Sequence, residues 1–94
     1  SHTPHLIAAA LAAATPAAAR PLTAGGWRDT TRVAAGDPEL WADILLDNAS
    51  AVADQLTAVT AVTDQLRQAI AAGDRAALSR LLTRAKESRD ALGS

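Results

Sequence analysis

Residues 37–74, DPELWADILLDNASAVADQLTAVTAVTDQLRQAIAAGD, decide the fold of this chain. Asp37 is a good N-cap, Pro38 suits the first helical position, and Glu39 suits the positive end of the helix dipole. No glycine or proline occurs from residue 39 to residue 72. Apolar side chains recur mostly every three or four residues, which is the helical period; they are Trp41, Ile44, Leu45, Val52, Leu56, Val59, Val62, Leu66 and Ile70. The stretch predicts one long helix that closes at Gly73.

A second helix is predicted to follow at once, because Asp74 can cap it and leucines recur through residues 78–92. A first helix of more than 30 residues would span ~50 Å and needs neighbours along its whole length. The second helix supplies one neighbour, and a partner chain can supply the rest. We therefore predict an all-α fold, a helical bundle with one long helix that forms an intertwined or side-by-side homodimer.

The composition supports one small domain, residues 1–94, whose core contains few large apolar side chains. Hydrophobic residues make up 49% of the chain, but many are alanine, and there is no Phe, Tyr or Met and only two Trp. The net charge of −1 gives no basic footprint for nucleic acid and no polybasic membrane surface. There is no cysteine, so neither a disulfide frame nor a thiolate metal site is expected.

The N-terminal third is rich in alanine and is predicted to form a buried helix over residues 5–15. The apolar run 6–19 is too short to span a membrane and is interrupted by Pro16. Residues 20–26 are predicted as a loop because of Pro21 and the Gly25-Gly26 pair. Residues 30–35 suit a short helical stretch that Gly36 would end.

The segment GGWRDTTR, residues 25–32, gathers polar and bulky groups between alanine-rich stretches. The planar guanidinium of Arg32 matches a carboxylate with two hydrogen bonds. Asp29, three residues earlier, either holds Arg32 in place or forms a solvated surface pair with it. Trp27 is expected to anchor the segment, since indoles are more often core or interface anchors than ligand stackers.

The opening SHTPH places His2 and His5 three residues apart at a helix start, close to free backbone N–H groups that suit anions. The alternative is a disordered terminus with two exposed histidines. A zinc site is disfavoured because the chain has no cysteine and no further histidine. No nucleophile with an activating base and no glycine-rich nucleotide loop is present, so no catalytic residue is assigned.

SHTPH, GGWRDTTR and DPELWADI occur in this order, and with them the sequence resembles the C-terminal domain of prephenate dehydrogenase and its arogenate-using relatives. That family has a Ser-His-x-Pro-His element opening a helix, a Gly-Gly-aromatic-basic-Asp-x-Thr-Arg segment, and then Asp-Pro-x-x-Trp-x-Asp-Ile. The departures are mild: Thr3 replaces a frequent Leu and Trp27 a frequent Phe.

The resemblance implies a helical domain that forms the dimer and helps to build the substrate cleft. It implies that Arg32 binds a substrate carboxylate, supported by Asp29, and that His2 and His5 line the cleft where substrate or the inhibitor tyrosine sits. Two further residues would belong to this region: Gly25, which lets the backbone approach the ligand, and Trp41, near the pocket.

The resemblance also implies an N-terminal Rossmann-type domain that binds NAD or NADP and carries the histidine that accepts the hydroxyl proton. Residues 1–94 would then be a fragment without that domain, inactive alone, from a cytoplasmic enzyme of tyrosine biosynthesis. That enzyme would oxidise and decarboxylate prephenate to 4-hydroxyphenylpyruvate. The alternative is a stand-alone helical module that dimerises or senses an aromatic amino acid without catalysis. The sequence leaves open prephenate or arogenate, NAD or NADP, and inhibition by tyrosine.

Overall fold

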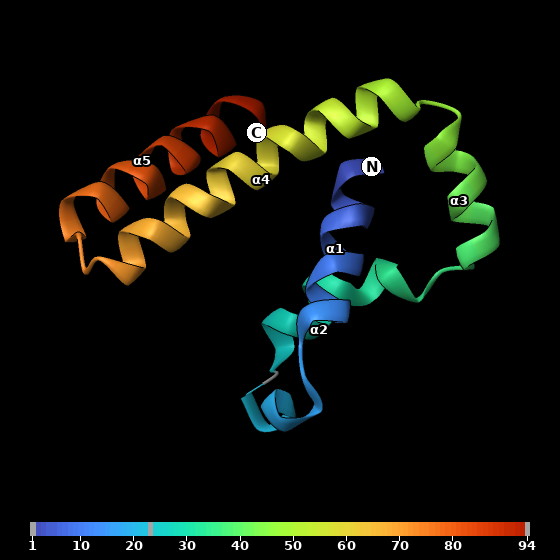
Figure 1. The fold of residues 1–94 in the computed structure, drawn as a ribbon, viewed down its shortest axis with the longest axis horizontal. Coiled ribbons are helices and arrows are strands. Elements are labelled where there is room, and N and C mark those ends of the chain that lie inside the picture. The colour runs from blue at the N-terminus through green and yellow to red at the C-terminus, as the bar shows by residue number, and fades with distance from the viewer. Residues whose placement is uncertain (1, 23, 94) are drawn as a thin grey trace. The chain divides into compact units, whose positions relative to one another are not determined.

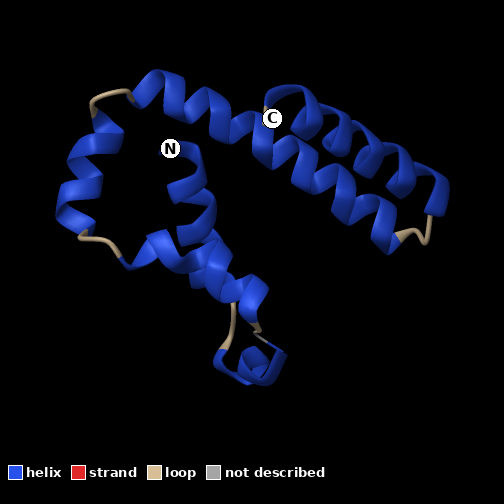
Figure 2. Ribbon diagram, turned by 180° about the vertical axis from the view of Figure 1, so that it is seen from behind, coloured by secondary structure: helices blue, strands red, loops and turns tan. Residues whose placement is uncertain are grey.

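The computed structural model describes residues 2–22 and 24–93, with the backbone alone for residues 20–22. These residues form helices joined by short turns, with no strand among them (Figure 1, Figure 2). The elements are α1 (His2–Ala14), the 3-10 helix η1 (Ala17–Leu22), α2 (Gly25–Thr31), the 3-10 helix η2 (Arg32–Ala35), α3 (Pro38–Leu46), α4 (Ala49–Ala71) and α5 (Arg75–Leu92). The prediction of an all-α fold is confirmed.

Helix α1 begins three residues before the predicted start and ends at Ala14, one residue before the predicted end and two before Pro16. Proline lacks an N–H and disfavours a helical conformation for the residue before it. The hydroxyl of Thr15 donates to the Leu11 carbonyl oxygen at 2.7 Å and so satisfies one acceptor of the last turn. Within the described residues, no helix is both long and apolar enough to cross a bilayer.

The predicted loop at residues 20–26 is wrong in part, because a 3-10 helix covers Ala17–Leu22 and α2 already begins at Gly25. Ala24 has an extended backbone, and its carbonyl oxygen accepts the Arg28 N–H at 3.2 Å, which starts α2 without a side-chain cap. The two glycines occupy the first turn of α2 rather than a loop.

The single long helix predicted for residues 39–72 is also wrong, since α3 ends at Leu46 and α4 starts at Ala49. The interruption falls at Asp47 and Asn48, whose short polar side chains favour turns and caps over helix interiors. The Asn48 N–H donates to the Leu45 carbonyl at 3.3 Å, and the Asn48 carbonyl accepts the Val52 N–H at 3.0 Å, which begins the next helix.

Both predicted helix caps are present. The Asp37 carboxylate accepts the Glu39 N–H at 3.1 Å, and the Asp74 carboxylate accepts the Ala77 N–H at 3.0 Å. Gly73 has a φ of +64°, which its missing Cβ permits. The N–H of Gly73 donates to Ile70 and that of Asp74 to Ala69, so α4 ends in a Schellman motif that turns the chain into α5.

The chain divides into two compact units, Ser1–Leu56 and Thr57–Ser94. In the first, α1 packs against α2 and η2, with Ala8, His5 and Thr31 buried. In the second, the C-terminal part of α4 and α5 lie side by side and share the lining of one groove (Figure 1). Ala69 is the buried residue there, and Leu66, Leu78 and Leu81 are half-buried.

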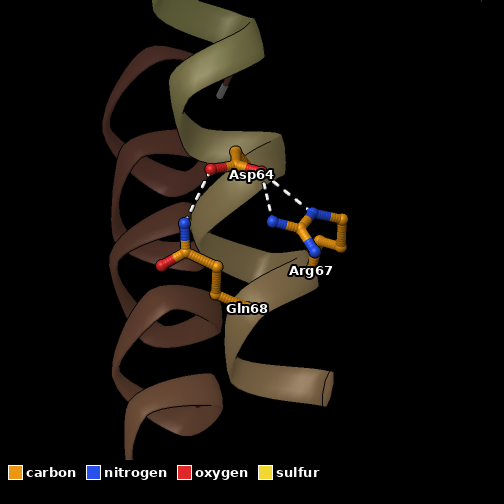
Figure 3. A network of polar contacts seen from close by, with 3 residues as sticks. All are labelled: Asp64, Arg67 and Gln68. Atoms are coloured by element: carbon orange, nitrogen blue, oxygen red, sulfur yellow. Dashed lines mark hydrogen bonds and ion pairs between the residues drawn. The ribbon is translucent and has the colours of Figure 1, made fainter. Parts of the chain in front are cut away.

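A polar network lies on the exposed surface of α4 (Figure 3). Arg67 donates from Nε to Asp64 Oδ1 at 2.9 Å, and Gln68 donates from Nε2 to Asp64 Oδ2 at 2.7 Å. The hydrogen bond from Arg67, its positive charge and the hydrogen bond from Gln68 hold the pKa of Asp64 below its ordinary value of 3.8. The network fixes three side chains one turn apart on a single helix.

Candidate functional site

The first feature of the site is a ring stack between α1 and α3. The imidazole of His5 lies against the indole of Trp41, with ring centroids 3.8 Å apart and planes inclined by 19°. His5 is buried, and its Nδ1 has no hydrogen-bond partner among the described residues, whereas Trp41 is half-buried. The structure therefore brings together two predicted site residues that lie 36 positions apart, and it rejects an exposed His5.

Gly36 makes room for this stack. A Cβ at Gly36 would lie 2.9 Å from Nε1 of Trp41, closer than Cβ atoms approach other heavy atoms, and 3.1 Å from Cδ1, which is a tight contact. Its φ is −66°, so the glycine is required by the space that the indole occupies and not by a left-handed conformation. Gly36 was predicted only to end a helix, and its contact with Trp41 was not predicted. The one available sign of the contact was a glycine placed five residues before a tryptophan.

His2 lies in the first turn of α1 and is half-buried. With Thr3 and Pro4 it lines an open hollow of about 390 Å³ whose other wall is the start of α4. The remaining lining residues are Asn48, Ala51, Val52 and Gln55. Both histidines of the SHTPH motif are thus ordered in a helix, while Ser1 of that motif lies outside the described residues.

A hydrogen bond from the Trp27 side chain links α2 to the end of α1. The Trp27 Nε1–H donates to Thr15 Oγ1 at 3.0 Å, and Thr15 in turn donates to the Leu11 carbonyl. In the same helix, the hydroxyl of the buried Thr31 donates to the Trp27 carbonyl at 2.8 Å. Trp27 therefore anchors its segment as expected, and Thr15 is the partner that sequence reasoning missed.

Gly25, Asp29 and Arg32 follow one another along α2 and into η2, and all three are exposed. No ion pair joins Asp29 to Arg32; the ion pairs of the described residues are Arg67–Asp64 and Lys86–Asp90. The expectation that Asp29 holds Arg32 directly is not met, and both remain open to solvent. A Cβ at Gly25 would meet nothing within 4 Å, so its surroundings are open.

All six predicted site residues lie in the unit Ser1–Leu56. Because α1, α2 and η2 pack against one another, the elements that carry His2, His5, Gly25, Asp29 and Arg32 are neighbours, and the ring stack adds Trp41 of α3. An exposed guanidinium can bind a carboxylate, and a buried imidazole nitrogen can take a hydrogen bond. Among the described residues, no hydrogen bond joins Arg32 to either histidine.

Large apolar side chains are uncovered in both units. Those exposed are Leu11, Val33, Leu40, Leu46, Val62, Ile70, Leu82 and Leu92, whereas the buried apolar residues among those described are Ala8 and Ala69. Fold and surface together define the class: an all-α helical chain that leaves large apolar side chains uncovered.

Comparison with known proteins agrees with this class. Residues 1–84 match the family described as prephenate dehydrogenase, dimerization domain. The chain belongs to this family.

Curated relatives carry the same assignment. The chain is 36% identical over 99 residues to a prephenate dehydrogenase of Bacillus subtilis, covering 98% of this chain and 26% of that protein. It is 50% identical over 52 residues to a cyclohexadienyl dehydrogenase of Zymomonas mobilis, covering 55% of this chain and 18% of that protein. The chain thus spans about a quarter or less of the length of these relatives.

The fold also matches a solved structure. The crystal structure of Synechocystis arogenate dehydrogenase superposes with a TM-score of 0.82 at 33% identity, covering 96% of this chain and 35% of that one. The helical arrangement described above is therefore shared with part of a dehydrogenase.

Proposed function

We propose that this chain is the dimerization and substrate-binding domain of a prephenate or arogenate dehydrogenase. The observation that carries the proposal is the family match over residues 1–84, a range that contains all six predicted site residues. The whole enzyme would oxidise the ring hydroxyl of its substrate, pass hydride to NAD or NADP, and lose carbon dioxide as the ring becomes aromatic. Prephenate would give 4-hydroxyphenylpyruvate, in the cytoplasm.

Arg32 is the residue proposed to bind a substrate carboxylate. Its guanidinium is exposed and forms no ion pair with any described residue, so it is free to form two charge-assisted hydrogen bonds. Asp29, also exposed and one helical turn earlier, would orient it when substrate is bound. Gly25 would let the backbone of α2 approach the ligand closely.

His2 and His5 would line the cleft for substrate or for tyrosine. A buried polar atom without a partner costs free energy, and a bound ligand that supplies a hydrogen bond to His5 Nδ1 would remove that cost. The stack on Trp41 restrains the plane of the imidazole. The stacked pair of His5 and Trp41 would form one wall of the cleft, His2 would add a second imidazole, and Arg32 would supply charge.

Pairing with a second copy would cover the apolar side chains. A folded domain of this size commonly buries several large aliphatic residues, whereas Leu46 here is 71% exposed and Ile70 is 65% exposed. The family description and the uncovered surface both favour a homodimer. The cofactor would be held by a separate nucleotide-binding domain, which would also carry the catalytic histidine.

Two measurements test the proposal. Sedimentation equilibrium of the chain over a concentration series is expected to show a stable dimer, and a monomer throughout would remove the dimerization role. A protein that joins this domain to its nucleotide-binding domain is expected to reduce NAD or NADP with prephenate or arogenate. Absence of turnover with both substrates and both cofactors would remove the dehydrogenase role. The chain alone is expected to show no reduction.

A further inference from the structure

We propose that the groove between α4 and α5 receives helix α3 of a second copy of the chain. The inference rests on the proposed dimerization role and names the surfaces that would meet. The groove lies far in sequence from the ligand-binding motifs of residues 1–32, whereas α3 also carries Trp41 of the candidate site. Two copies related by a twofold axis would form this contact twice, with each copy giving one helix and one groove.

The groove has the shape and lining of a helix-docking surface. Its volume is about 500 Å³, and small apolar side chains from both helices line it: Ala69 and Ala72 from the α4 side, and Ala77 with Leu81 from α5. Small side chains leave room for larger ones from a partner helix to pack between them. The polar lining residues are Gln65, Gln68, Asp74, Arg80 and Arg84.

The groove carries a net positive charge, because two arginines and one aspartate, Asp74, line it. Arg80 and Arg84 stand four residues apart on α5, so their charges are neighbours on one helix face and repel each other. Both are exposed, and neither forms an ion pair with a described residue. If an anionic helix lay along α5, its attraction to each of the two arginines would offset the repulsion between them.

Helix α3 has the matching features. Glu39, Asp43 and Asp47 follow one another at intervals of four along α3 and its C-cap, all are exposed, and none forms an ion pair with a described residue. The helix contains no basic residue. Its exposed Leu40 and Leu46 would supply the large side chains that the groove admits.

The charge complementarity extends to the whole units. Residues 1–56 contain six acidic and three basic side chains, whereas residues 57–94 contain four acidic and six basic ones. Opposite potentials favour pairing of the acidic part of one copy with the basic part of another and disfavour pairing of like parts. The spacing of four residues is the same on both helices, so Asp43 and Asp47 can face Arg80 and Arg84 as two pairs.

The test uses two charge-reversed chains and sedimentation equilibrium. Arg80→Glu with Arg84→Glu places acid against acid, and Asp43→Arg with Asp47→Arg places base against base. Each variant alone is expected to dimerise at least about 100-fold more weakly than the unmodified chain, because attraction becomes repulsion at both contacts. Mixing the two variants is expected to restore a dimer, since both contacts in the heterodimer are again of opposite charge.

Arg75→Glu with Arg89→Glu is the matched control. It makes the same change of net charge on α5 but alters no residue that lines the groove, and it is expected to change the dissociation constant by less than about tenfold. Circular dichroism of every variant confirms that helix content is kept. Added salt is expected to weaken the unmodified dimer.

Each outcome decides the inference. If the unmodified chain dimerises and the reversals do not weaken it, the inference is overturned while the dimerization role stands. If the Asp43→Arg/Asp47→Arg chain dimerises normally, α3 does not face the groove. If neither variant dimerises alone and mixing them restores no dimer, Asp43 and Asp47 of one copy do not face Arg80 and Arg84 of the other. A monomeric unmodified chain removes the dimerization role and this inference together.

Discussion

The imidazole of His5 and the indole of Trp41 are stacked with centroids 3.8 Å apart, and this contact joins the first helix of the chain to the third. Stacked aromatic pairs contribute about 0.5–1.5 kcal/mol beyond the area that they bury. Among the described residues the buried apolar side chains are those of two alanines, so a contact between two rings adds to the packing within residues 1–56. The same pair restrains the ring plane of a histidine that is proposed to face substrate.

Gly36→Ala should disturb this stack. The new methyl group would lie 2.9 Å from the indole nitrogen of Trp41, and relieving the overlap would displace the ring from its stacked position on His5. We expect a loss of about 1–3 kcal/mol in the free energy of unfolding, the range for overpacking. Urea unfolding followed by tryptophan fluorescence measures it.

Gly26→Ala is the control for that substitution. A Cβ at Gly26 meets nothing within 4 Å, and the residue lies in helix α2, where alanine is favoured over glycine by about 0.5–1 kcal/mol. The control is expected to be neutral or stabilising. Equal effects of the two substitutions would show that the indole does not depend on the space at Gly36.

Trp27→Phe and Thr15→Val should show that the hydrogen bond between these side chains fixes α2 to α1. The Trp27 Nε1 to Thr15 Oγ1 distance is 3.0 Å in a partly buried setting, so each single change is expected to cost about 1–2 kcal/mol. A double-mutant cycle is expected to give a coupling of about 1 kcal/mol. Thermal unfolding provides the values.

Thr63→Val serves as a comparison, because Thr63 also donates to a carbonyl one turn earlier but stands exposed with no side-chain partner. Its effect is expected to stay within about 0.5 kcal/mol. A coupling near zero between Trp27 and Thr15 would mean that the hydrogen bond contributes nothing to the docking of α2.

The sequence predicted those features of the fold that depend on local chemistry. The caps at Asp37 and Asp74, the turn at Gly73 and the end of α1 before Pro16 each follow from one or two residues, and each is present. The break at Asp47–Asn48 was missed because helical periodicity continues in register across it, so apolar spacing alone gives no sign of the interruption.

For the site, spacing alone was less informative. The SHTPH motif placed His2 and His5 at a helix start, but only the fold shows that His5 is buried against Trp41, because that contact joins distant residues. The partnership of Trp27 with Thr15 is invisible for the same reason. The sequence left open whether Asp29 holds Arg32 or both are solvated; in the structure both are exposed and form no ion pair, since each has water as an alternative partner.

Arg67→Ala should raise the pKa of Asp64 toward its ordinary value of 3.8. In the folded chain that pKa is lowered, first by the hydrogen bond from Arg67. A lowered folded pKa means that the stabilisation is fully present above the unfolded value and is lost as the pH falls through the folded one. The stabilisation that this network gives should therefore be constant around neutral pH and should be lost only below about pH 3.8.

Titration of the Asp64 carboxyl carbon by NMR checks this directly. Gln68→Ala is expected to raise the same pKa by less than Arg67→Ala does, because it removes a neutral hydrogen bond and no charge. An unchanged Asp64 titration in the Arg67→Ala chain would show that the ion pair is not formed in solution.

Arg32→Ala should raise KM in a dehydrogenase that contains this domain together with its nucleotide-binding domain. Loss of a charge-assisted, two-point contact with a carboxylate costs about 2–3 kcal/mol, which is tens- to a hundredfold in KM when ground state and transition state lose it equally. The guanidinium is exposed and unpaired in the structure, so its removal should leave thermal stability unchanged. Arg28→Ala, an exposed arginine one turn earlier, is expected to keep KM within about twofold. If both variants retain the kinetics of the unmodified enzyme, Arg32 does not bind substrate. If both lose activity to the same extent, the effect is one of overall positive charge, and the assignment of the carboxylate to Arg32 fails as well.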